Sequence, residues 1–114
     1  MSIEERVVQV ARQFGLPCAH PNYDGEEKTF LTFNISAVPM NYADDGPEHE
    51  KWLIELHLFA PVGQNTRRLR KELRQAIYDA GFTYPDQTDA SEAYKKTDGS
   101  EQHIIFDFED AEAI

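Results

Sequence analysis

The sequence predicts a two-layer α+β domain, with about four strands in an antiparallel or mixed sheet and two helices packed on one face of it. Two periodicities indicate this class. Apolar residues recur at helical spacing in two segments, whereas other segments alternate between apolar and polar side chains, as strands do. The elements follow in the order α-β-β-α-β-β over residues 3–14, 28–38, 52–59, 66–79, 90–96 and 102–109.

The first helix has clear start and stop residues. Ser2 and Glu5 form a capping-box pair, in which each side chain satisfies a backbone N–H at the beginning of the helix. Gly15, followed by Leu16 and Pro17, is typical of a helix end, because glycine adopts the left-handed conformation and proline cannot continue the helix. A helix over residues 3–14 is therefore expected.

The centre of the fold is a strand over residues 52–59 and a helix over residues 66–79. Alternate residues of the strand, beginning with Trp52, are strongly apolar, and the Pro/Gly-containing segment 60–63 ends it. Thr66 stands at the expected N-cap of the helix, and Gly81 follows its last apolar residue. Strand and helix must pack together to bury their apolar faces.

Two hairpins are predicted. The strands over residues 28–38 and 52–59 most simply pair as an antiparallel hairpin, joined by the acidic, aperiodic segment 39–50, which is interpreted as a long loop. Asp98 followed by Gly99 predicts a tight turn between the strands over residues 90–96 and 102–109. Residues 82–84 are expected to form a short edge strand ending at Pro85.

The length of 114 residues indicates one domain over residues 1–114 that can bury a core without disulfides. A single cysteine, Cys18, excludes an internal disulfide, and folding in a reducing cytosol is expected. No apolar run reaches the ~20 residues needed to span a bilayer, so no membrane association is expected.

The charge is unevenly distributed. The net charge is −10, yet the helix over residues 66–79 carries five of the eleven basic residues. The same helix carries two acidic residues. The rest of the chain therefore has 6 basic and 19 acidic residues, a net charge of −13. We call the five basic residues of this helix the basic stripe: Arg67, Arg68, Arg70, Lys71 and Arg74.

Three interpretations of the basic stripe remain open. A charged helix face in water is preferred, an intersubunit salt-bridge surface comes second, and DNA binding comes a distant third. Arg68 and Glu72 stand at i,i+4 and partly neutralise each other. An acidic molecule repels nucleic acid overall, so no sequence-specific nucleic-acid binding is expected.

The second face of the predicted sheet is neither fully polar nor fully apolar. This composition is too apolar for a solvated surface and too polar for a sealed core, and it favours a subunit interface. The face combines Phe30, Leu53, Phe59 and Ile105 with Thr32, Asn34, Glu55, His57 and Asp107.

Two groups of residues could carry chemistry. Asp44, Asp45 and His49 offer oxygen and nitrogen ligands, but their spacing matches no established metal motif, so a solvated acidic loop is favoured. His57 and Glu55, opposite Asp107 and His103, could form an acid–base cluster, or equally polar groups of a surface. The sequence has no HExxH, GxSxG or Gly-rich phosphate loop. No catalytic residue, metal or cofactor, and no enzymatic activity, is therefore expected.

Several segments resemble small tail-terminator or tail-completion proteins of long-tailed bacteriophages and prophages. These are Pro-Met-Asn-Tyr-Ala-Asp-Asp at 39–45, a strand ending near Phe59, the helix end Ala-Gly-Phe at 80–82, and a late hairpin with Tyr94, Asp-Gly at 98–99 and His103. The resemblance covers residues 29–108. The sequence departs from the family's pattern at residues 84–91, so the resemblance does not fix the position of the third strand.

The resemblance implies a structural role. Members assemble as a ring, commonly a hexamer, that caps the tail tube and provides the surface for head joining. The expected partners are other copies of this chain, the tail-tube protein and a head-completion or connector protein. The expected location is the virion tail at the head–tail junction, after synthesis in the bacterial cytoplasm. Ring or tube contacts are expected at Tyr42, Asp44, Asp45, Arg67, Arg70, Lys71 and Arg74, and on the sheet at Phe30, Leu53 and Phe59.

Two alternatives remain. One is another component of the same phage machinery, such as a head–tail connector or tube-associated protein, which the neighbouring genes would distinguish. The other is a small cytosolic binding module or enzyme of this α+β shape, which a deep pocket around His57 and Asp107 would favour.

Overall fold

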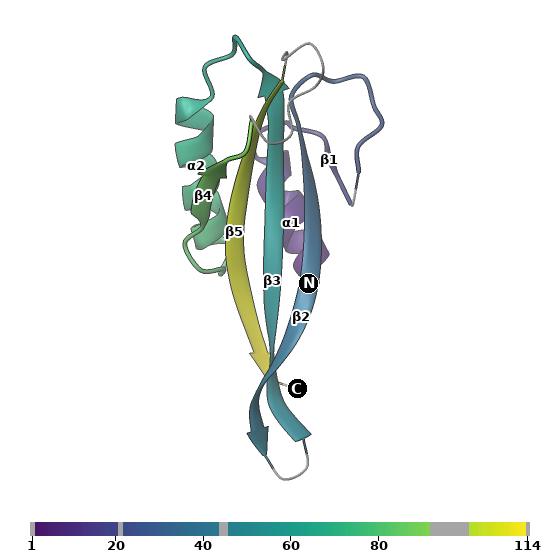
Figure 1. The fold of residues 1–114 in the computed structure, drawn as a ribbon, viewed down its shortest axis with the longest axis vertical. Coiled ribbons are helices and arrows are strands. Elements are labelled where there is room, and N and C mark those ends of the chain that lie inside the picture. Colours follow the sequence, from purple (N-terminus) through teal and green to yellow (C-terminus); the bar gives the residue numbers. More distant parts are fainter. Residues whose placement is uncertain (1, 21, 44–45, 92–100, 114) are drawn as a thin grey trace.

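The protein is an α+β domain with a mixed five-stranded sheet and two helices (Figure 1). The computed structural model describes residues 2–20, 22–43, 46–91 and 101–113. The elements are α1 (Ile3–Arg12), β1 (Cys18–Ala19), β2 (Phe30–Ala43), β3 (Gly46–Pro61), α2 (Arg67–Asp79), β4 (Asp86–Asp89) and β5 (Glu101–Ala113).

The strand order is β1-β2-β3-β5-β4, with β1 parallel to β2 and every other pair antiparallel. The expected count of about four strands is therefore too low. The additional strand β1 lies between residues 3–14 and 28–38, where the sequence predicts no helix or strand, and it pairs Cys18 with Leu31. A strand of two residues is too short to show any periodicity, which is why the sequence does not reveal it.

The first hairpin is confirmed, but the long loop expected over residues 39–50 is wrong. β2 continues to Ala43 and β3 begins at Gly46, so the ladder continues through the pairs Pro39–Glu50 and Ala43–Gly46. Figure 1 shows this end of the hairpin projecting beyond both helices, in a molecule with extents of 54 × 28 × 23 Å.

The edge of the sheet next to β5 also differs from the expectation. Residues 82–84 are not a strand, and β4 begins only after Pro85, whose missing N–H cannot donate to the ladder. Thr83 still reaches β5, because its N–H donates to Glu109 O (3.1 Å) and its hydroxyl accepts from Glu109 N (2.9 Å). Of the predicted strand 90–96, Ala90 and Ser91 are not in a strand, and the rest lies outside the described residues.

One hydrophobic core joins both helices to the same face of the sheet. The apolar positions predicted for the strands over residues 52–59 and 102–109 are confirmed, since alternate residues there belong to this core. In β2 the prediction holds for Leu31, Phe33 and Ile35, whereas Ala37 is exposed. Val7 and Val10 of α1 and Leu73 and Ile77 of α2 cover that face. The strand residues of this core are Leu31, Phe33, Ile54, Leu56, Leu58, Ile104, Phe106 and Phe108.

The helix ends follow the expected signals with one exception. The Ser2–Glu5 capping box is present, and Gly15 and Gly81 have positive φ values of 66° and 97°. Thr66 is the N-cap residue of α2, but its hydroxyl makes no cap bond and instead donates to Gln102 Oε1 (2.9 Å). The hydroxyl therefore bonds to a residue of β5 instead of capping its own helix.

Arg6 connects the two helices to the sheet. Its guanidinium donates to Asp110 Oδ2 (2.9 Å) and to the carbonyl of Ala80 (3.0 Å), and it lies 4.1 Å from the centre of the Phe82 ring. The positive φ of Gly81 lets the chain pass close to this guanidinium.

Candidate functional site

The sheet face opposite the helices carries a row of aromatic side chains. We call this face the open face. The register places Phe30 opposite Phe59 and Phe59 opposite His103. The ring centres are 4.6 Å apart for Tyr23 and Phe30, 5.0 Å for Phe30 and Phe59, and 4.2 Å for Phe59 and His103. These four rings form the aromatic row, which crosses the sheet from the segment before β2 to β5.

The open face has the mixed character that the sequence predicted. Phe30, Leu53 and Phe59 are half-buried, and Asn34 and Asp107 are exposed. Within the described part of the chain, both helices belong to the core on the other face. The open face therefore has its apolar rings at the end of the sheet where β2 begins, and polar groups such as Asn34 and Asp107 farther along the strands.

An ionisable cluster lies beside the aromatic row. Glu55 Oε1 is 2.7 Å from His57 Nε2, and His57 Nδ1 is 2.6 Å from His103 Nε2. Both imidazoles are buried. Burial, and the neighbouring His57, lower the pKa of His103 to about 4, which keeps that ring neutral. The expected acid–base cluster thus forms, but its imidazoles are enclosed and link β3 to β5.

A groove with four carboxylates, which we call the acidic groove, lies on the open face near β4. Its volume is about 350 Å³, and its acidic residues are Glu55, Asp86, Asp107 and Glu109. Burial, and then the charge of Glu55, raise the pKa of Asp107. Lys51 pairs with Glu109 at 3.0 Å, at one end of the group. The groove is a site of concentrated negative charge.

The five residues of the basic stripe line a second groove, of about 730 Å³, together with Asn65 and Gln87. Arg68 pairs with Glu72 at 2.8 Å, as predicted. Arg74 bonds to Gln87, and its Nε donates to the Tyr84 hydroxyl (3.4 Å). Within residues 46–91 and the other described ranges, no carboxylate forms an ion pair with the remaining three, Arg67, Arg70 and Lys71.

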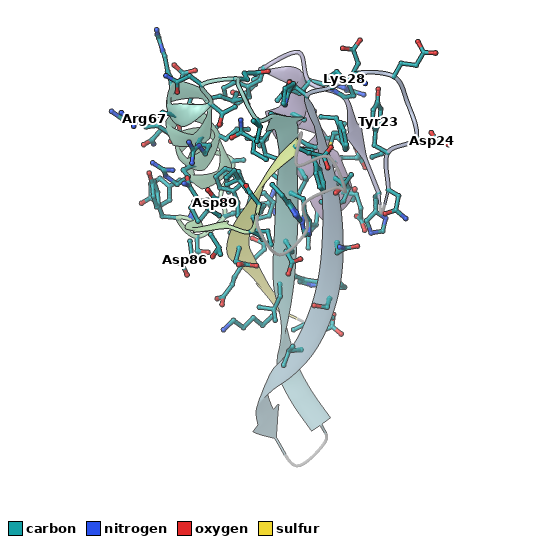
Figure 2. The ribbon with its side chains drawn as sticks, turned by 45° about the horizontal axis from the view of Figure 1, so that its top comes forward. Tyr23, Asp24, Lys28, Arg67, Asp86 and Asp89 are labelled. Atoms are coloured by element: carbon teal, nitrogen blue, oxygen red, sulfur yellow. The ribbon has the colours of Figure 1, made fainter. Side chains whose placement is uncertain are left out.

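Strand β4 separates the two grooves. Asp86 is opposite Asp107 and shares its face, whereas Gln87 is opposite the core residue Phe106 and lies on the side of α2. Figure 2 shows Arg67 on α2 with Asp86 and Asp89 along this edge, and Tyr23 on the other side of the molecule. Two tyrosines lie beside the basic stripe. Tyr78 and Tyr84 are 55% and 51% exposed, with ring centres 5.9 Å apart.

The predicted contact residues fall into three places. Phe30 and Phe59 stack on the open face, Leu53 lies on the same face farther along β3, and the predicted basic residues lie together on α2. Tyr42 is in the projecting end of β2, where it pairs with Pro47. Asp44 and Asp45 lie outside the described residues.

In the portion of the chain that the structure describes, no three His, Cys, Asp or Glu side chains are placed to hold a metal ion. Neither α1 nor α2 is long and apolar enough to cross a membrane.

Comparisons with known proteins assign no family. No protein-family model matches the chain, and the search of curated proteins gave no match.

Proposed function

We propose that this protein is a structural protein of a long-tailed phage or prophage, and that it acts as a tail terminator. In this role a ring of copies, commonly a hexamer, caps the tail tube and forms the surface for head joining. The proposed partners are the tail-tube protein and a head-completion or connector protein, at the head–tail junction of the virion. The role is structural and requires no catalysis.

The observation that carries the proposal is the open face with its aromatic row. Phe30 and Phe59 stack on each other at 5.0 Å without a covering helix among the described elements. Burying apolar surface is favourable by about 25 cal/mol per Å², so two half-buried rings, with Leu53 farther along the same face of β3, favour contact with another protein surface.

The charge distribution supports a ring in particular. The basic stripe and the acidic groove lie on different sides of β4 in the same molecule. A contact between unlike surfaces repeats from copy to copy and closes into a ring when the rotation permits it. Outside α2 the chain is acidic, which would let DNA pass through such a ring without binding to it.

The direct test is the solution mass from light scattering over a range of protein and salt concentrations, followed by negative-stain microscopy of the largest species. A closed ring is expected, either alone or after purified tail tubes are added. A protein that stays monomeric under all these conditions and does not bind the tubes would contradict the proposal.

The basic stripe provides a second test. Arg70→Glu together with Arg74→Glu is expected to weaken assembly while the circular dichroism of the monomer stays unchanged, because both side chains lie at the surface groove of α2. Arg12→Glu together with Lys28→Glu is the matched control, since both residues are exposed and lie outside that groove. Normal assembly of the Arg70→Glu, Arg74→Glu variant would show that these two residues are not part of the interface.

A small binding module is the second candidate, and the acidic groove favours it. A groove of about 350 Å³ lined by four carboxylates fits a small cationic ligand. Thermal-shift screening with polyamines and amino sugars tests this candidate. Stabilisation that Asp107→Asn removes would support it against the tail-terminator proposal.

A further inference from the structure

We infer that the basic stripe of one copy docks into the acidic groove of the next copy. This inference rests on the proposed ring and names the two surfaces that would form its contact. The occupant of each groove is therefore a second copy of this chain.

The basic stripe has the properties of a docking surface. It lines a hollow of about 730 Å³, so its cations surround a recess instead of standing apart on a convex helix. Arg67 and Lys71 are exposed, one helical turn apart, and neither is in an ion pair among the described residues. Such a concentration of unneutralised positive charge attracts an acidic protein surface.

The acidic groove has the complementary charge. The register places Glu55 and Asp86 on either side of Asp107, so three carboxylates lie on neighbouring strands β3, β5 and β4. Carboxylates opposite one another in a sheet repel, and the pKa of Asp107 is raised first by burial and then by the charge of Glu55. Cations from another copy would relieve that repulsion.

The two surfaces are placed so that the basic stripe of one copy cannot bind the acidic groove of the same copy. β4 lies between them, with Asp86 on the open face and Gln87 beside Arg74 on the helix face. Tyr84 stands at the boundary, since it lines the acidic groove and accepts a hydrogen bond from Arg74. Each copy would then give one surface and receive the other, which is the arrangement of a head-to-tail ring.

A charge-swap experiment tests the inference. The stripe variant carries Arg67→Glu and Lys71→Glu, and the groove variant carries Asp86→Lys and Asp107→Lys. Glu55 is left unchanged because it contacts His57. Association of the full-length proteins is measured by sedimentation velocity at low salt and at about 0.15 M salt. Arg12→Glu with Lys28→Glu is again the control. If the groove variant fails to fold, Asp86→Asn with Asp107→Asn replaces it.

Each variant alone is expected to associate at least about tenfold more weakly than the wild type. An equimolar mixture of the two is expected to regain association, because the reversed stripe meets the reversed groove and the native stripe meets the native groove. The mixed assembly would alternate the two variants. With the neutral groove variant, association is expected to be weakened, and its mixture with the stripe variant is expected to form pairs through the one native contact without closing into a ring.

Other outcomes overturn the inference. Rings that persist in both single variants would overturn the docking of these surfaces and leave the proposed tail-terminator function intact. Salt-sensitive association that each variant loses and the mixture regains, but that never closes into a ring, would support the docking and count against that function. A wild type that stays monomeric at low salt would overturn the inference. Tight binding of a labelled single-stranded oligonucleotide by the wild type, lost in the stripe variant, would overturn it in favour of nucleic acid as the occupant.

Discussion

His57 and His103 face each other on the open face with 2.6 Å between Nδ1 of the first and Nε2 of the second. They come from adjacent strands but are not direct register partners, because His57 is opposite Ile105 and His103 is opposite Phe59. At this distance the two nitrogens share one hydrogen, so one of them must be unprotonated. The pair therefore couples the packing of β3 and β5 to pH.

Stability is expected to fall when this pair is protonated. The pKa of His103 is about 4 in the folded protein and 6.5 for an unperturbed histidine, so the unfolded chain binds the proton more readily. The contribution is complete above pH 6.5 and is lost as the pH falls toward 4. The loss amounts to at most about 3 kcal/mol, to be measured by urea unfolding at several pH values.

The control for this pH dependence is His103→Gln, which keeps a hydrogen-bonding side chain but does not titrate. Its free energy of unfolding should fall less steeply between pH 6.5 and 4 than that of the wild type. Comparing the two proteins cancels the titrating groups that do not interact with His103, among them Asp107, whose pKa is raised. Asp89, whose pKa is lowered by its bonds from Ser91, interacts with His103 and changes with it. Parallel pH profiles would show that His103 is not the responsible group.

Leucine-to-alanine substitutions on the two faces of β3 are expected to lower the free energy of unfolding by different amounts. Leu58→Ala empties a fully buried core position and should cost about 2–5 kcal/mol of unfolding free energy. Leu53→Ala removes a half-buried side chain from the open face and should cost about 1 kcal/mol in the monomer. Urea unfolding at high salt measures both. Equal costs would mean that the open face is as well packed as the core.

Arg6 should matter more than its place on a helix surface suggests. Arg6→Met keeps the packing over Phe82 but loses the bonds to Asp110 and to the Ala80 carbonyl, so a loss of about 1–3 kcal/mol is expected. Arg12→Met on the same helix is exposed and should change stability by less than about 0.5 kcal/mol. Thermal unfolding of the two variants decides, and equal melting temperatures would refute the role of Arg6.

Cys18 should react slowly in the native protein. Burial raises the pKa of its thiol from 9.0 to about 11, so the reactive thiolate at pH 8 is about 100-fold scarcer than in the unfolded chain. Labelling with a disulfide reagent, with and without urea, measures the ratio. Rates that agree within a few-fold would show that the thiol is accessible.

The sequence predicts most strongly what short-range physics controls. The capping box at Ser2, the left-handed glycines and the alternation in β3 all appear in the structure, because each depends on residues within one turn or one strand. The errors concern long-range pairing. β1 forms because Leu31 and Thr32 lie on a strand edge with which Cys18 and Ala19 can pair. The hairpin extends to Ala43 because its two strands stay in register and continue to pair.

The candidate surfaces show the same division. The composition of α2 determined that a basic stripe would exist, and strand alternation determined that a half-apolar sheet face would exist, since both follow from helical and strand periodicity. Only the tertiary structure decided what lies beside them. The strand order β3-β5-β4 brings Glu55, Asp107 and Asp86 into one groove, and the turn after α2 returns Tyr84 to Arg74. These residues are separated in the sequence and follow no helical or strand periodicity that would relate them, so only packing and strand register fix their positions.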